Sequence, residues 1–72
     1  MVYQNSASYL WIKGETYYFN RRVPKDIQSY YSSSRIVICL KTSRRDSALR
    51  TARSIAQRLE DYWMSLRLAN ID

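Results

Sequence analysis

The sequence predicts an α+β fold, in which a three-stranded antiparallel β-sheet packs on one long C-terminal α-helix and a short helix joins the second and third strands. Two runs of aromatic and β-branched residues, separated only by Gly14 and Glu15, predict a β-hairpin. A third β-branched run follows a loop of serines, and the rest of the chain has the apolar spacing of an amphipathic helix. With 72 residues, the chain has room for one small core.

The hairpin is expected to pair residues 9–13 with residues 16–22. Glycine at the first central position suits a type II′ turn, which needs a positive φ there and follows the twist of the flanking strands. Because side chains alternate along a strand, the register set by this turn also decides which residues share a face. The expected pairs are Lys13 with Thr16, Ile12 with Tyr17, Trp11 with Tyr18, Leu10 with Phe19 and Tyr9 with Asn20.

The two faces of this hairpin differ in chemistry. Apolar side chains that suit a core gather on one face, namely Leu10, Ile12, Tyr17 and Phe19. Aromatic, amide and cationic side chains gather on the other, namely Tyr9, Trp11, Lys13, Thr16, Tyr18, Asn20 and Arg22. A solvated sheet face seldom needs so many aromatic side chains, which are enriched where proteins bind partners. The second face is therefore expected to be exposed and functional.

The chain between the hairpin and the long helix supplies the short helix and the third strand. Val23-Pro24 is expected to end the second strand, because proline offers no N–H to a ladder, and to start a short helix at about residues 25–31. Ser32-Ser33-Ser34 then forms a loop, and residues 35–40 form the third strand. Ile36, Ile38 and Leu40 are expected to join the core, with Arg35, Val37, Cys39 and Lys41 outward.

The long helix is expected to start at a capping box formed by residues 43–46. Its predicted apolar stripe is Ala48, Ala52, Ile55, Leu59, Trp63 and Leu66. Asp46 lies four residues before Arg50, which favours an ion pair. The expected organisation is a flexible leader at 1–8, a single β-β-α-β-α domain at 9–68, and at 69–72 the start of a linker to a missing downstream domain.

Composition directs the functional interpretation towards a polyanion. Twelve Lys and Arg residues against six Asp and Glu give a formal net charge of +6, which favours nucleic acid as a partner. The chain has no histidine, one cysteine and one glycine, which argues against catalytic constellations, metal sites and glycine-rich phosphate loops. It also lacks a signal peptide and an apolar run of membrane-spanning length. We therefore expect a non-catalytic, cytoplasmic domain without a cofactor, small-molecule ligand or membrane partner.

The outward face of the sheet is the main candidate site, because it is suited to the major groove of DNA. There, Arg or Lys can read guanine, Asn can read adenine, and aromatic groups can touch the thymine methyl. A basic cluster also surrounds the expected N-terminus of the long helix, where free N–H groups favour phosphate. The predicted DNA-binding residues are Trp11, Lys13, Tyr18, Asn20, Arg22, Arg35, Lys41, Arg44 and Arg45. Purely structural interpretations are that the aromatic pair stabilises the hairpin, that basic residues discourage edge pairing and that the cluster only caps the helix.

The chain resembles the small N-terminal domain of phage- and prophage-type integrases, the tyrosine site-specific recombinases. Three stretches carry the resemblance: residues 9–14, residues 16–27, and residues 39–42 leading into a helix with Ala48, Ala52 and Ala56. The resemblance implies a domain whose sheet binds arm-type DNA sites, with the recombinase's catalytic residues in a downstream domain. Asn20 stands where many relatives are basic, and Lys41 stands where glycine is common, which suggests a different turn into the helix.

Two functions are therefore expected. The first is binding to duplex DNA as a module of an integrase, associated with the bacterial nucleoid when bound. The alternative is a protein–protein interaction module, in which the aromatic face docks on other domains of the recombinase or on a neighbouring subunit. Met64 and Leu68, which fall off the core stripe, offer further apolar contacts for such a partner.

Overall fold

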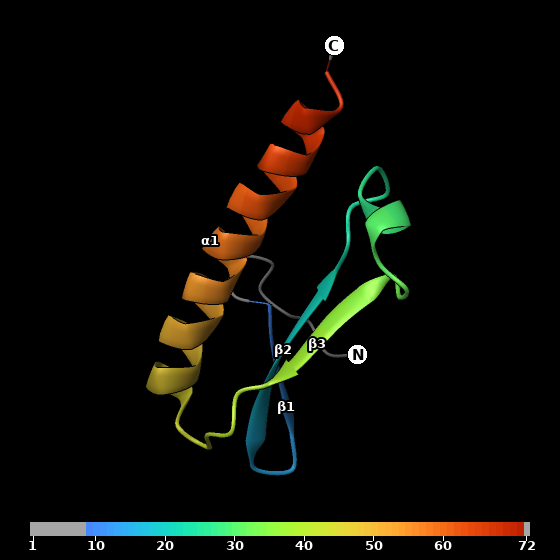
Figure 1. Cartoon of the computed structure of the whole chain (residues 1–72). Coiled ribbons are helices and arrows are strands. Elements are labelled where there is room, and N and C mark those ends of the chain that lie inside the picture. The colour runs from blue at the N-terminus through green and yellow to red at the C-terminus, as the bar shows by residue number, and fades with distance from the viewer. Residues whose placement is uncertain (1–8, 72) are drawn as a thin grey trace.

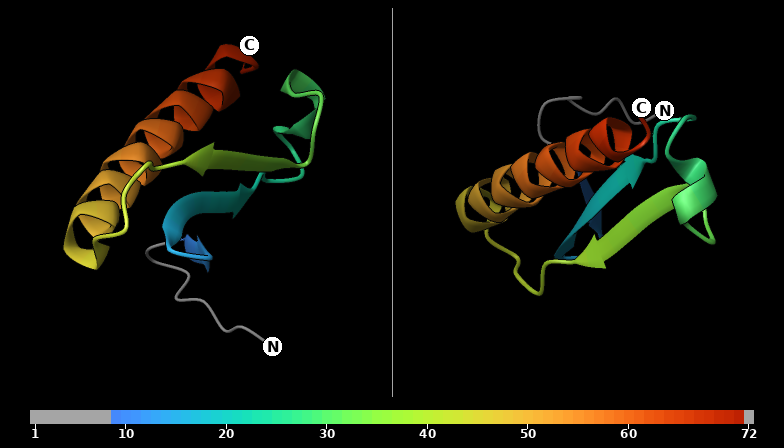
Figure 2. Two further views of the ribbon diagram at one scale, coloured as in Figure 1. Left: turned by 90° about the horizontal axis from the view of Figure 1, so that it is seen from below. Right: turned by 45° about the horizontal axis from the view of Figure 1, so that its top comes forward.

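The computed structural model describes residues 9–71 and shows a three-stranded antiparallel sheet with one long helix on one side of it (Figures 1 and 2). The strands follow one another across the sheet in the order β1-β2-β3, as in a simple meander. The predicted α+β fold is therefore confirmed. The elements are β1 (Leu10–Lys13), β2 (Thr16–Arg22), the 3-10 helix η1 (Gln28–Tyr30), β3 (Arg35–Cys39) and α1 (Arg45–Ala69).

The register of the hairpin is the predicted one. Lys13 is opposite Thr16 and Trp11 is opposite Tyr18, with the pairs between and beyond them in step. Gly14 has a φ of +63°, and Glu15 after it is not among the described residues with positive φ. A positive φ at the first central residue alone is the pattern of a type II′ turn, so the turn matches its prediction.

Tyr9 departs from the predicted alternation. Its φ of +54° is left-handed, which turns the side chain out of the strand pattern just before β1 begins. The ring lies 5.8 Å from the ring of Phe19, on the side of the sheet that faces α1. Its carbonyl still accepts a hydrogen bond from the Asn20 N–H (3.0 Å), so the expected backbone pairing holds. The prediction that the Tyr9 side chain shares the outward face was wrong.

The core lies between the sheet and α1. Six hydrophobic residues there are at most 1% exposed: Phe19, Val23, Ile27, Ala48, Ala52 and Trp63. The small side chains of Ala48 and Ala52 let the helix approach β2 closely. The indole N–H of Trp63 donates to the Tyr31 hydroxyl oxygen (2.9 Å), which satisfies its one polar atom. The predicted stripe of α1 is confirmed at these buried positions.

Two residues predicted to join the core are instead exposed, Ile12 by 57% and Ile38 by 38%. Both side chains lie on the expected face of the sheet. Ile12 is paired with Tyr17, which shares a face with Phe19, and Ile38 is paired with Phe19 itself. Ile12 lies beside the hairpin turn, and Ile38 lies on the edge strand β3, whereas α1 packs on β2 and β1. A single helix is too narrow to cover every apolar position of the sheet.

The short helix expected between β2 and β3 is the 3-10 turn η1. Bonds between residues three apart run from the N–H of Ile27 to the carbonyl of Pro24 (2.9 Å) and from the N–H of Tyr30 to the carbonyl of Ile27 (2.9 Å). The amide of Gln28 donates to the Val23 carbonyl (2.8 Å) and closes the turn. A helix this short is held by tertiary contacts, and only Ile27 in this turn is fully buried. The prediction of a short helix between β2 and β3 is therefore confirmed, although the helix is a 3-10 turn over fewer residues than the expected 25–31.

The predicted capping box is also absent. The helix begins at Arg45 with Arg44 as its N-cap, and no side chain caps it. The hydroxyl of Thr42 accepts from the Arg44 N–H (3.1 Å), which fixes the chain before Ser43 can act as a cap. The Asp46 carboxylate pairs with Arg44 (3.2 Å) and not with the arginine four residues on. Hydrogen bonding to Arg44 lowers the pKa of Asp46 below its ordinary value.

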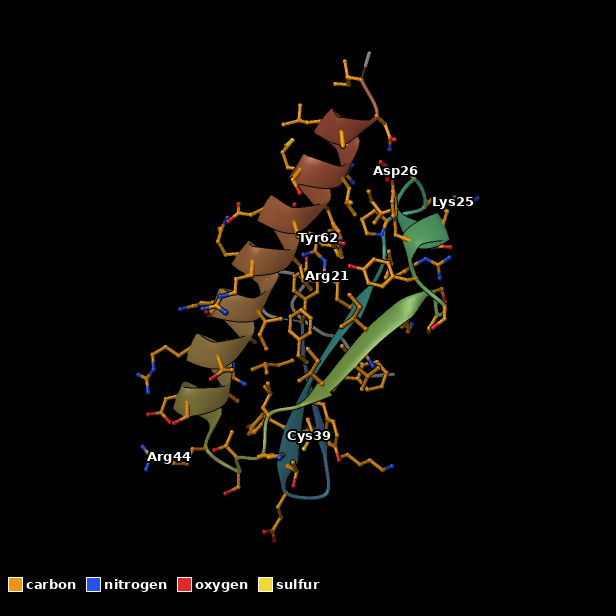
Figure 3. The ribbon with its side chains drawn as sticks, in the orientation of Figure 1. Arg21, Lys25, Asp26, Cys39, Arg44 and Tyr62 are labelled. Carbon is orange, nitrogen blue, oxygen red and sulfur yellow. The ribbon has the colours of Figure 1, made fainter. Side chains whose placement is uncertain are left out.

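The C-terminal turns of α1 are tied to the segment that joins β2 to β3. Arg67 donates to the Asp26 carboxylate (2.7 Å), and the amide of Asn70 donates to the Tyr30 hydroxyl oxygen (2.9 Å). The hydrogen bond from Arg67 holds the pKa of Asp26 below its ordinary value. In Figure 3, Asp26 lies in the loop after β2, on the side nearest the C-terminal turns of α1.

Within the described residues, no helix combines the length and apolar character that a membrane span requires.

Arg21 lies inside the sheet–helix interface (Figure 3). Its neighbour Arg22 points to the other side of the sheet and is exposed. The guanidinium carbon of Arg21 is 4.4 Å from the centre of the Tyr9 ring and 4.7 Å from that of the Trp63 ring. It also forms an ion pair with Glu60 of α1, and its side chain is 13% exposed. Arg21 thus joins β2 to α1 by the cation–π contact with Trp63 and the ion pair with Glu60, and its contact with Tyr9 links it to the residue before β1.

We expect Arg21→Ala to lower the free energy of unfolding by about 2 kcal/mol, because it removes partly desolvated cation–π contacts and the packing of the arginine stem. Arg22→Ala, one residue on, should change it by less than about 0.5 kcal/mol, because this side chain is exposed. Urea denaturation followed by tryptophan fluorescence measures both. Equal losses in the two variants would contradict the assignment of these arginines to opposite faces.

Candidate nucleic-acid interface

The face of the sheet turned away from α1, here called the outer face, carries side chains from all three strands. Pairing places Trp11 beside Tyr18 and Arg22 beside Arg35. No element among residues 9–71 covers this side of the sheet (Figure 2), and Trp11 at its centre is 46% exposed. The outer face consists of Trp11, Lys13, Thr16, Tyr18, Asn20, Arg22, Arg35, Val37 and Cys39.

The outer face has an apolar centre and basic ends. Lys13 lies at the hairpin end, and the pair Arg22 and Arg35 lies at the other end. A strand advances about 3.4 Å per residue, so these two ends are roughly 20 Å apart. Between them is a cavity of about 240 Å³ lined by Trp11, Lys13, Tyr18, Asn20 and Val37. Aromatic and aliphatic groups thus occupy the middle, with cations on either side.

Acidic side chains are kept away from the outer face. Within residues 9–71, Asp26, Asp46 and Glu60 pair with Arg67, Arg44 and Arg21, all elsewhere in the fold. Asp61 accepts from an amide on α1, and Glu15 sits in the hairpin turn. The outer-face cations therefore have no carboxylate among the described residues on their own face. Three of the twelve Lys and Arg residues, Lys13, Arg22 and Arg35, thus lie on the outer face. Others, among them Arg50, Arg53 and Arg58, are exposed on α1.

Arg22 and Arg35 are directly opposite one another, which places two like charges across the β2–β3 ladder. Such pairs destabilise a sheet, because the repulsion is not compensated by contact. Arg35 relieves part of it by donating to the side-chain oxygen of Asn20 (2.9 Å), its diagonal neighbour. This bond uses one lone pair of that oxygen and neither amide N–H of Asn20. The three side chains together present cationic and amide donors at one end of the face.

The structure separates the predicted DNA-binding residues into two groups. The first group lies on the strands and shares the outer face as predicted; it consists of Trp11, Lys13, Tyr18, Asn20, Arg22 and Arg35. Lys41 and Arg44 lie between β3 and α1, Arg45 is the first residue of α1, and all three are exposed. Figure 3 shows Arg44 at this end of the helix. Lys41 has a φ of +56°, the left-handed conformation that suits glycine. Arg44 forms an exposed ion pair with Asp46 (3.2 Å).

Val37 belongs to the site although it was not among the predicted contact residues. It lines the cavity together with the aromatic pair and is 57% exposed. Alternation along the third strand indicated its outward direction, but an aliphatic side chain carries no functional signal in a sequence. Its part in the site became visible only when the register placed it beside Asn20.

Comparison with known proteins shows the family of the chain. Residues 9–68 match a family described as a domain of unknown function (DUF6538), so the chain belongs to that family. No curated protein and no solved structure matches the chain. The matched range includes all three strands and α1 up to Leu68, so the outer face lies wholly within the shared domain.

We expect Arg22→Glu to raise the free energy of unfolding by about 0.5 kcal/mol, because it replaces a repulsive cross-strand pair with an attractive one. The matched control is Lys13→Glu, which makes the same charge change opposite the neutral Thr16 and should bring no gain. Urea denaturation at low salt measures both variants. A loss of stability in Arg22→Glu relative to Lys13→Glu would show that the arginine pair is not repulsive.

Proposed function

We propose that this member of the DUF6538 family binds duplex DNA through the outer face of its sheet. The observation that carries the proposal is the gathering of Trp11, Tyr18, Asn20 and the basic side chains on one exposed face without a described carboxylate. Basic side chains supply affinity for phosphates, and aromatic and amide groups supply contacts to base edges. A polyanion is the partner that such a charge distribution favours.

The dimensions of the outer face suit the major groove. That groove is about 12 Å wide, and its phosphates flank it on both sides. The basic ends of the outer face are roughly 20 Å apart, so Lys13 and the Arg22–Arg35 pair can approach opposite phosphate backbones. The apolar centre and Asn20 then face the base edges. A phosphate beside Arg22 and Arg35 also removes their mutual repulsion, which favours the bound state.

The resemblance to the N-terminal domains of phage and prophage integrases supports a more specific form of the proposal. In this form, the domain binds arm-type sites on behalf of a tyrosine recombinase during DNA integration, acting on the nucleoid in the cytoplasm. The domain then contributes binding and no chemistry of its own. The cluster of Lys41, Arg44 and Arg45 adds phosphate contacts where β3 leads into α1.

Binding is expected to weaken with salt. If the domain neutralises about four to six phosphates, log affinity should fall against log salt concentration with a slope of roughly −4 to −5. Arg22→Ala should weaken binding by about 1–3 kcal/mol. Arg58→Ala, which removes the same charge from an exposed position on α1, should have little effect. Fluorescence anisotropy of labelled duplex across a salt series gives both quantities.

Two results of this titration would count against the proposal. No binding of the wild-type domain even at low salt would remove DNA as the partner. Equal effects of Arg22→Ala and Arg58→Ala would mean that net charge, and not the outer face, holds the duplex. A weak salt dependence together with capture of the recombinase's other domains would favour the docking alternative.

The single cysteine offers a direct test of the bound face. Cys39 is exposed beside Tyr18 on the outer face, at the end of β3 (Figure 3). We expect alkylation of Cys39 by a maleimide to slow in proportion to the fraction of protein bound to duplex, because the DNA covers the thiol. As a control, the double variant Cys39→Ser, Ser54→Cys carries its thiol on an exposed position of α1 and should react equally with and without DNA. Unchanged alkylation of Cys39 at saturating duplex would place the DNA on another surface.

A further inference from the structure

The apolar centre of the outer face has a chemistry that basic side chains alone do not explain. The cavity of about 240 Å³ has walls from Trp11, Tyr18 and Val37, with Lys13 and Asn20 also in its lining. Both Trp11 and Val37 remain about half exposed, so this surface meets solvent when the domain is free. A bound duplex places base edges against it, and their chemistry must suit an apolar wall.

The four bases differ sharply in what they present to such a wall. In the major groove, guanine and adenine present ring-nitrogen acceptors and exocyclic groups, and cytosine presents an amino donor. Polar groups pressed against an indole and an isopropyl group lose their water without gaining a hydrogen bond. Thymine alone presents a methyl group, whose burial on an apolar surface is favourable.

We propose, on the basis of the function proposed above, that the cavity between Trp11, Tyr18 and Val37 receives the 5-methyl group of a thymine in the target duplex. Asn20 in the lining suits the same base pair, because its side-chain oxygen retains a second lone pair and its amide donors are not used by Arg35. An adenine edge takes an amide in this way, so the cavity and Asn20 together favour an A·T pair.

The charges around the cavity argue for a DNA methyl group and against an aliphatic side chain of a partner protein. Lys13 stands on one side of the cavity, with Arg22 and Arg35 on the other. An apolar group that enters between these cations is favoured when it is carried on a chain of phosphates. Thymine in duplex DNA combines a methyl group with flanking negative charge, which an uncharged protein surface lacks.

The test removes one methyl group at a time. A duplex is first selected from a randomised pool by the wild-type domain and is then synthesised with deoxyuridine in place of each thymine in turn. This substitution deletes the methyl group and leaves base pairing unchanged. At one thymine position we expect about fourfold weaker binding, the loss that corresponds to exposing one buried methyl-sized group. The other thymine positions should bind as before.

Two variants connect that loss to the cavity. Trp11→Ala removes one wall, so the ratio of thymine to deoxyuridine affinity at the sensitive position should fall to near one. Met64→Ala removes an exposed apolar side chain from α1 and should keep the wild-type ratio. Trp63, buried in the core, remains as the fluorescent reporter of folding in the Trp11 variant.

The outcomes separate this inference from the proposed function. Selected duplexes that bind equally with deoxyuridine at every position, or that contain no thymine, would overturn the methyl-binding cavity and leave DNA binding intact. A ratio that survives Trp11→Ala would also overturn it. Failure of the domain to bind any duplex would remove the proposed function and the cavity's role together.

Discussion

Side-chain alternation along β2 is the constraint on which both the core and the candidate interface depend. This strand is central in the sheet, so its inward residues meet α1 while its outward residues lie in the middle of the exposed face. Phe19 and Arg21 point to the helix, and Tyr18, Asn20 and Arg22 point away from it. A slip of one residue would exchange the two sets, so that Tyr18, Asn20 and Arg22 would face the helix and Phe19 would face solvent. The same register therefore determines both which side chains form the core and which side chains form the outer face.

The inner contacts that hold this register are concentrated in a few side chains. Trp63 packs with Val23 and Ile27, bonds to Tyr31 and lies beneath the guanidinium of Arg21. A domain of this size buries a smaller share of its surface than a large domain does, so each such contact carries a large part of the net stability. The covered side of the sheet performs all of this packing. The uncovered side is consequently free to carry residues that contribute to binding at some cost in stability.

Much of the fold follows from the sequence because local and long-range signals agree. Gly14 sets the hairpin turn, the turn sets the register, and the register divides the faces. The incorrect expectations lie where a tertiary or backbone detail overrides a local pattern. A tyrosine gives no signal for the left-handed φ that Tyr9 adopts. The hydrogen bond from the Arg44 N–H to the Thr42 hydroxyl replaces the cap expected at Ser43. The inward contact of Arg21 could not be predicted from its neighbours in the sequence, because it depends on Trp63, which is 42 residues away. The candidate site was predictable as a face, but its cavity was not.

On the proposed function, the facing arginines Arg22 and Arg35 give stability and binding opposite responses to ionic strength. In the free domain, added ions screen the repulsion between Arg22 and Arg35 and so strengthen the sheet at that end. If the domain binds duplex DNA as proposed, the same ions compete with it for phosphates and weaken that binding. The strand ends are thus most strained under the conditions in which nucleic acid would be held most firmly. On the proposed function, a bound phosphate would then serve as the counterion of Arg22 and Arg35.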